Sequence, residues 1–122
     1  MSKVLSDDRP RESRVQATEW GAMDWLVDDA MVENAGLSVA RMTLERDACS
    51  PGHRHPDCNE VIHLIEGSVE QTVDRHRHVM EPGDTVFVPA GAHHRSRNIG
   101  PGAAVVIVSY SAGTRIYEAA AE

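Results

Sequence analysis

The stretch EPGDTVFVPAGAHHRSRN, residues 81–98, decides the fold. It holds a Pro-Gly-Asp turn, the apolar run TVFV, a Pro-Ala-Gly turn, and then the pair His93 and His94. Turn residues that bracket a short run of β-branched and aromatic residues predict a strand between two tight turns. The second turn therefore brings two imidazoles together directly after a strand.

A second stretch, HRHPDCNEVIHLIEG at residues 53–67, contains further side chains that bind metals. Residues two apart on a strand share a face, so His53 and His55 direct two imidazoles at one point, and Glu60 joins them if the intervening residues loop back. Imidazole and carboxylate together suit a divalent ion of iron, manganese, nickel, cobalt, zinc or copper. All seven histidines lie between positions 53 and 94, which favours a shared site over a polar loop with solvated histidines.

The rest of the chain consists of short apolar runs separated by turn residues. LSVARMTL at 37–44 and AVVIVSY at 104–110 are typical of strands. Short strands with Gly and Pro between them predict an all-β sandwich or barrel, and 122 residues suit one domain. We expect a flexible N-terminal arm over 1–18, the barrel over 19–117 and a C-terminal tail over 118–122.

Together the two stretches resemble the cupin family, whose fold is a β-barrel of the double-stranded β-helix or jelly-roll type. The first cupin motif, G-x5-H-x-H-x3-4-E-x6-G, is matched over 53–67 by His53, His55, Glu60 and Gly67, while Asp47 stands at its leading glycine. The second motif, G-x5-P-x-G-x2-H-x3-N, is matched completely over 83–98 by Gly83, Pro89, Gly91, His94 and Asn98. The missing leading glycine is a turn residue, and its absence does not affect the ligand positions.

The resemblance implies one divalent transition metal per chain, with His53, His55, Glu60 and His94 as its ligands. Four protein ligands leave one or two positions open on a five- or six-coordinate ion. It thereby implies an enzyme that acts on a small oxygenated or anionic molecule, through oxygenase-type chemistry or through Lewis-acid chemistry of the isomerase or lyase type. Two alternatives stay open, namely a non-catalytic module that binds or senses a small molecule, and a barrel that the metal merely stabilises.

Strand parity selects residues for the inner wall. If Glu60 points inward, Ile62 and Leu64 share its face and His63 faces outward. An inward His94 likewise places Ser96 inside. The candidates for contact with the substrate are Arg41, Gln71, Ile62, Leu64 and Ser96, of which the first two lie on strands whose phase the sequence does not fix.

Arginines next to the ligands are excluded by the same parity. Arg95 and Arg97 alternate with the inward residues of their strand and point away, and Arg54 lies between two inward histidines. Arg54 is therefore not expected to contact a substrate.

The acid or base candidates near the site are His93, which flanks it, and Glu60 if it leaves the metal. Tyr110 and Tyr117 come at the end of the last long strand and beyond it, so we expect them to lie away from the metal. That placement disfavours the tyrosine-assisted cleavage of dimethylsulfoniopropionate that some cupin lyases perform.

Other reactive side chains are assigned ordinary roles. His76 and His78 fall in a hairpin turn without a carboxylate at a useful spacing, so we expect them to be solvated. Cys49 and Cys58, the only cysteines, are expected to be free thiols.

Charge and composition restrict the partners. Twelve basic against nineteen acidic side chains give a net charge of −7, which argues against nucleic acid. No apolar run reaches the length of a membrane span, and the charged first residues lack the apolar core of a signal peptide, so we expect a cytoplasmic protein without membrane contact. Many single-domain cupins are homodimers, and Trp20 and Trp25 suit an N-terminal strand that pairs across a dimer.

Overall fold

A computed structural model describes residues 2, 4, 5 and 14–120. Within these residues the regular structure consists of strands, and no helix is long and apolar enough to cross a membrane. The strands are β1 Val15–Ala17, β2 Gly21–Val27, β3 Ser38–Leu44, β4 His53–Arg54, β5 Glu60–Glu66, β6 Val69–Val73, β7 His76–Met80, β8 Thr85–Val88, β9 His94–Asn98, β10 Ala104–Tyr110 and β11 Glu118–Ala119.

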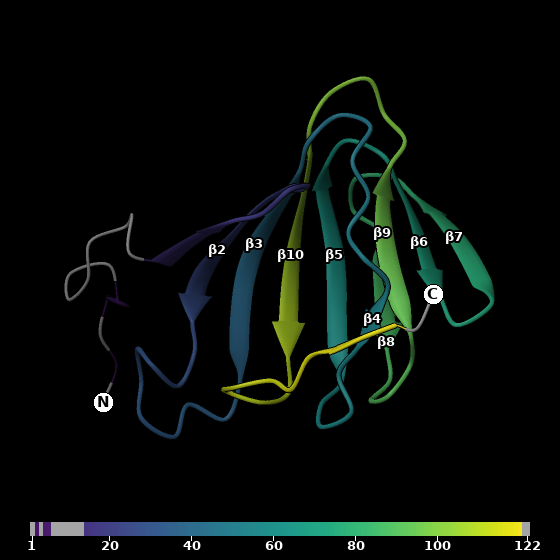
Figure 1. Cartoon of the computed structure of the whole chain (residues 1–122). Helices are drawn as coiled ribbons and strands as arrows, with labels where there is room; N and C mark the ends of the chain where they lie inside the picture. The colour runs from purple at the N-terminus through teal and green to yellow at the C-terminus, as the bar shows by residue number, and fades with distance from the viewer. Residues whose placement is uncertain (1, 3, 6–13, 121–122) are drawn as a thin grey trace.

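The strands form two antiparallel sheets that face each other (Figure 1). One has six strands in the order β1-β2-β3-β10-β5-β8, and the other has five in the order β11-β4-β9-β6-β7. Because β10 pairs with both β3 and β5, the last long strand lies in the middle of the larger sheet. This is the predicted all-β jelly-roll barrel of the cupins.

Alternation along the strands builds the core. In β10 every second residue is buried, and β3 and β5 show the same two-residue period because one face of each strand points between the sheets. Leu44, Leu64 and Val108 are buried almost completely. Each such side chain stabilises the fold by about 1.5–3 kcal/mol relative to an exposed one.

Two motif residues hold the barrel together. The Asn98 side-chain amide donates hydrogen bonds to the carbonyl oxygens of Leu44, Glu45 and Gly102, at 3.1, 3.0 and 2.8 Å. Gly67 has a φ of 92°, and a Cβ there would meet Cα of Ala104 at 2.9 Å. Both positions of the cupin motifs therefore serve the packing of connections between strands.

The ends of the barrel differ from the boundaries predicted from the sequence. Residues 15–17 form β1 and pair with β2, so the last part of the expected N-terminal arm belongs to the larger sheet. Residues 118–119 of the expected tail form β11 and pair with β4. Residues 1, 3 and 6–13 of the expected arm lie outside the described part of the chain. The alternation signal is weak in such two- and three-residue strands, which is why the sequence did not reveal them.

Candidate metal centre

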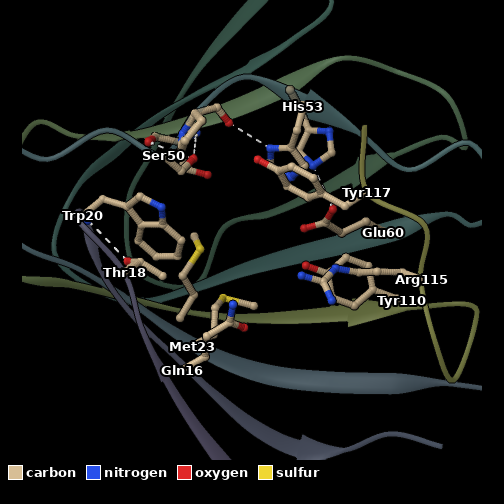
Figure 2. A pocket seen from close by; sticks show the side chains of 14 residues that line it. Gln16, Thr18, Trp20, Met23, Ser50, His53, Glu60, Tyr110, Arg115 and Tyr117 are labelled. Carbon is tan, nitrogen blue, oxygen red and sulfur yellow. Dashed lines mark hydrogen bonds and ion pairs between the residues drawn. The ribbon is translucent and has the colours of Figure 1, made fainter. Parts of the chain in front are cut away.

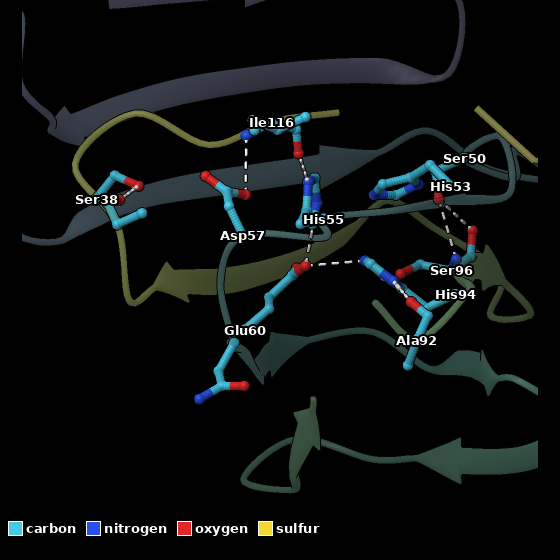
Figure 3. Close-up of polar contacts among 12 residues, drawn as sticks. Ser38, Ser50, His53, His55, Asp57, Glu60, Ala92, His94, Ser96 and Ile116 are labelled. Atoms are coloured by element: carbon cyan, nitrogen blue, oxygen red, sulfur yellow. Dashed lines mark hydrogen bonds and ion pairs between the residues drawn. The ribbon is translucent and has the colours of Figure 1, made fainter. Parts of the chain in front are cut away.

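The four side chains predicted as ligands meet at one point between the sheets (Figure 3). His53 lies in β4 opposite His94, the first residue of β9, and His55 follows one residue after β4 ends. Glu60 opens β5, where it pairs with Tyr110. One potential ligand atom from each of the four lies within 4.8 Å of every other.

Backbone carbonyl groups fix the orientation of all three imidazole rings. Nδ1 of His53 is 2.8 Å from the carbonyl oxygen of Pro51, and Nδ1 of His94 is 3.0 Å from that of Ala92. Nδ1 of His55 is 2.8 Å from the carbonyl oxygen of Ile116. A carbonyl oxygen only accepts, so each Nδ1 carries a proton and each neutral ring keeps a lone pair on Nε2. Metal-binding histidines are commonly oriented in this way.

The inward-facing atoms suit a cation. Nε2 of His94 lies 2.8 Å from Oε1 of Glu60, and Nε2 of His55 lies 3.4 Å from the same oxygen. All three atoms are buried, and within residues 14–120 they make no hydrogen bond of good geometry. Two acceptors so close together are stable only with a cation or a proton between them. Donors bind a divalent ion at about 2.0–2.2 Å, so donors on opposite sides are about 4.2 Å apart, close to the spread observed here.

The protonation of the rings follows from burial and from Glu60. Burial lowers the pKa of His53 to about 3, with help from the nearby His94, and burial also lowers the pKa of His55. Burial opposes protonation of His94 as well, but the Glu60 carboxylate 2.8 Å away outweighs it and raises the pKa of His94. A proton on His94 thus occupies the place of a cation, and metal and proton compete for this group.

A cavity of about 360 Å³ opens onto these side chains (Figure 2). Its wall includes His53, Glu60 and His94 at one end. Trp20, Met23 and Met42 also line the cavity, and Trp20 and Met23 lie across it from Glu60. Cavities of about 300–1,000 Å³ are typical for small-molecule ligands.

The C-terminal segment supplies cavity residues that sequence reasoning placed elsewhere. Tyr117 stacks on His53 with ring centroids 4.8 Å apart, and Tyr110 contacts the ring of His55 edge-on at 5.1 Å. The expectation that both tyrosines lie away from the site is wrong. Tyr110 is the inward last residue of β10 and pairs with Glu60, and Tyr117 is brought to the site because the chain after β10 turns back and crosses to β4 (Figure 1). Burial raises the pKa of Tyr110 strongly, so this phenol stays protonated and is a poor base.

Arg115 is a second residue of that segment that the sequence did not reveal. It lines the cavity, and its guanidinium lies 4.5 Å from the ring centroid of Trp25 and 5.0 Å from that of Tyr110. No motif contains this arginine, and its distance from the ligands along the chain hides it. Its place in the cavity wall follows from the path of the chain back over the barrel after β10.

The candidates for contact with the substrate separate into three groups. Ser96 lines the cavity, and its contact with a substrate stays a prediction. Gln71, Ile62 and Leu64 are buried but do not line it, and Gln71 instead accepts a hydrogen bond from the Ser96 hydroxyl. Arg41 is exposed on the outer face of β3, so its prediction as a substrate contact is wrong. The register of β3 depends on pairing with β2 and β10, which sequence alone does not give.

His93 also lies outside the site. Its side chain is exposed and absent from the cavity wall, while its backbone pairs with Asp74. The prediction of an acid or base role is therefore wrong, and the physical reason is the parity of β9. His63 faces outward as predicted, with Nδ1 2.7 Å from the Thr85 hydroxyl. His76 and His78 are exposed on β7.

The cysteines and the excluded arginines behave as predicted. Cys49 and Cys58 are free, and Cys58 is buried, which raises the pKa of its thiol to about 11. Arg95 and Arg97 are exposed on β9. Arg54 forms an ion pair of 2.7 Å with Glu118 across the pairing of β4 and β11.

Sequence relatives agree with the fold. The chain is 32% identical over 81 residues to germin-like protein 3-8 of Oryza sativa subsp. japonica, a match that covers 62% of this chain and 36% of the relative. A germin-like protein of Morus alba is 32% identical over 85 residues, which cover 66% of this chain and 41% of the relative. The chain thus spans about two fifths of the length of these curated relatives.

Solved structures show the same barrel. A variant of Bacillus subtilis oxalate decarboxylase superposes with a TM-score of 0.80 at 22% identity, over 88% of this chain and 30% of that one. An oxalate oxidase superposes with a TM-score of 0.74 at 20% identity, over 97% of this chain and 62% of that one. The Cupin domain family matches residues 40–110, more than half of the chain and both motifs. The chain belongs to the cupin family.

Proposed function

We propose that this protein is a metal-dependent cupin enzyme that acts on a small anionic or oxygenated molecule. One observation carries the proposal, namely that three imidazole Nε2 atoms and a carboxylate converge at the inner end of a cavity large enough for a substrate. His53, His55, Glu60 and His94 would hold one divalent transition metal. When bound, such an ion with open positions supplies Lewis acidity or a site for oxygenase chemistry.

The chain's own residues perform the remaining tasks. The hydrogen bonds from each Nδ1 keep the three rings aimed inward, and the buried surroundings strengthen electrostatic interactions with an anion. Tyr117 covers His53 on the cavity side, and Arg115 adds a positive charge to the wall. Proton transfer at this site falls to Tyr117 or to Glu60.

Related folds support a metal and a small carboxylate substrate. Oxalate decarboxylase and oxalate oxidase share the barrel, and the Bacillus subtilis decarboxylase has Mn(II) centres. Their identity to this chain is below 25%, so the metal and the reaction are inferred here from the ligand set. The cytoplasmic location and the homodimer stay predictions.

A non-catalytic module that binds or senses a small molecule is the second candidate. It is favoured by the scarcity of bases in the described cavity wall, where Tyr110 is protonated and His93 is absent. Turnover distinguishes the two candidates, because a binding module holds its ligand unchanged.

The test combines metal analysis with a screen for turnover. We expect purified protein to hold about one divalent ion per chain, and we expect Glu60→Gln combined with His94→Ala to lose it. His78→Ala, which changes an exposed ring, serves as the control. Iron- and manganese-loaded protein would then be offered oxalate, hydroxy acids, diketones and catechols, with O₂ uptake and product measured. Unchanged metal content in the double variant contradicts the ligand assignment, and ligand binding without product contradicts the enzyme.

A further inference from the structure

The cavity has two chemically different ends (Figure 2). Glu60, Arg115 and Tyr117 lie on one side, next to the three imidazoles. Trp20 and Met23 lie across the cavity from them. Thr18 and Gln16 lie on that side as well, but their side-chain oxygens already accept hydrogen bonds from the backbone N–H of Trp20 and from Nε1 of Trp25. A molecule that fills this space must therefore present a polar group to one end and an apolar group to the other.

At the polar end two aromatic rings position the guanidinium of Arg115, but no carboxylate of residues 14–120 balances its charge. Its guanidinium lies over the rings of Trp25 and Tyr110, and such stacking fixes the plane of the group while its in-plane N–H donors stay available. Nε of Arg115 is buried without a hydrogen-bond partner in residues 14–120, and no carboxylate of these residues forms an ion pair with it. Arg115 is half-buried and its charge is balanced by no carboxylate of residues 14–120, so an anion beside the guanidinium would provide the acceptor that Nε lacks.

The apolar end is a surface rather than a single contact. Met23 and Met42 come from the paired strands β2 and β3, where they are direct neighbours, and both are buried. Trp20 precedes β2 and packs against the core cluster that contains them. Thioethers and an indole ring adapt to apolar groups of different shape.

The volume of the cavity favours a ligand larger than a small dianion. A cavity of about 360 Å³ corresponds to about a dozen water molecules at about 30 Å³ each. A metal ion and a two-carbon dicarboxylate fill only the polar part of such a space. The apolar part would then hold water against Trp20, Met23 and Met42, and displacement of that water favours a ligand with an apolar body.

We propose that the substrate is a monocarboxylate with an apolar body, either a medium-chain aliphatic acid or an aryl acid. Its carboxylate lies against Arg115 and the open metal positions, and its apolar body lies against Trp20, Met23 and Met42. The inference rests on the proposed function, since it assigns the substrate class of the same metal site. It makes Arg115 a specificity-determining residue.

Binding to zinc-loaded protein tests the inference without requiring turnover. The probes are acetate, butanoate, hexanoate and oxalate, measured by calorimetry and by the fluorescence of the two tryptophans, with zinc content measured in the same samples. We expect the affinity to rise about fourfold for each added methylene, the increment for burial of one such group. Oxalate that binds more tightly than hexanoate, or affinity that does not change with chain length, overturns the inference.

Variants separate the two ends. Arg115→Gln should weaken hexanoate binding by about ten- to a hundredfold, as for loss of a charged hydrogen bond, while hexan-1-ol binding is unaffected. Arg115→Lys should restore part of the affinity, and Arg41→Gln, an exposed arginine on β3, should change nothing. Met23→Ser should reduce the dependence on chain length and leave acetate binding intact. Hexanoate affinity that Arg115→Gln leaves unchanged, in protein with normal zinc content and normal melting, refutes the role of this arginine.

The zinc measurement distinguishes failure of this inference from failure of the proposed function. Protein that holds zinc but shows no preference for longer acids refutes the substrate class and leaves the metal site standing. Protein that binds hexanoate through Arg115 but holds no metal supports the substrate class and refutes the metal-dependent enzyme.

Discussion

Nδ1 of His55 donates a hydrogen bond of 2.8 Å to the backbone carbonyl of Ile116, which lies 61 residues later in the chain. The backbone N–H of Ile116 in turn donates to Oδ1 of Asp57 at 3.0 Å (Figure 3). The C-terminal segment is thereby tied to the loop that carries a metal-ligand candidate. The orientation of the His55 ring depends on this connection.

Asp57→Ala is therefore expected to weaken metal binding although Asp57 is not a ligand. Loss of the acceptor frees Ile116, and support of this kind around a ligand commonly contributes about tenfold or more to metal affinity. Asp57→Asn keeps an oxygen acceptor and should bind metal nearly as well as the wild type. Competition with a fluorescent chelator measures both. Equal affinity for the wild type and Asp57→Ala would show that the contact does not orient His55.

The stability of the metal-free protein should fall as the pH drops from 7 to 5. Unfolded histidines titrate near a pKa of about 6.5, whereas the folded pKa of His53 is about 3 and that of His55 is lowered, so the unfolded state binds more protons in this range. His94 acts in the opposite direction, because its raised pKa gives stability that is present at low pH and lost as the pH rises through that value.

The lowered pKa values of His53 and His55 outweigh the raised pKa of His94. We therefore expect the Tm to decrease by about 5 °C between pH 7 and pH 5. Circular dichroism melts of chelator-treated protein measure it. His53→Gln should flatten the dependence, whereas His76→Gln, at an exposed ring, should not. A Tm that rises toward pH 5 would contradict the lowered pKa values.

Asn98→Ala should destabilise the fold by about 3 kcal/mol or more. The substitution leaves one buried and two part-buried carbonyl oxygens without the amide donor, and a buried group that loses its partner costs about 1–3 kcal/mol. Arg97→Ala, at the exposed neighbour, should cost less than about 0.5 kcal/mol. Urea unfolding measures both, and a similar small effect for the two variants would mean that water replaces the amide.

A pair of glycines provides a test of close packing. Gly67→Ala should destabilise the protein by more than about 1 kcal/mol, since φ is 92° and the new Cβ would lie 2.9 Å from Cα of Ala104. Gly102→Ala meets no atom within 4 Å and should be close to neutral. Thermal melts of the two variants give the comparison, and equal Tm values would contradict the close approach at Gly67.

The ligand set could be predicted because it is local in sequence and follows strand parity. His53 and His55 are two apart, and the motif spacing connects them to Glu60 and His94. Strand parity also placed His63 and Arg95 outside. Strand parity also predicts that the His93 side chain faces outward, because neighbours of an inward residue point outward, and closeness to His94 in sequence does not bring that side chain to the site.

The cavity wall could not be predicted because it depends on long-range pairing. To predict which face of the sheet Arg41 occupies, one needs the register of β3, and the pairing with β2 and β10 determines that register. The place of Arg115 and Tyr117 in the cavity wall depends on the turn of the chain after β10 toward β4, and no periodicity in the sequence predicts that turn. The sequence favours Trp20 in an N-terminal strand that pairs across a dimer, and its place in the cavity wall follows only from the position of β2.

The placement of the cavity wall has a consequence for redesigning the protein. The metal-ligand candidates come from the middle of the chain, whereas Gln16, Thr18, Arg115 and Tyr117 come from near its two ends. Part of the cavity wall thus comes from outside the motifs that carry the ligand candidates, so replacing residues 14–20 with the equivalent segment of another barrel should redirect selectivity, while the C-terminal segment must stay because Ile116 orients His55.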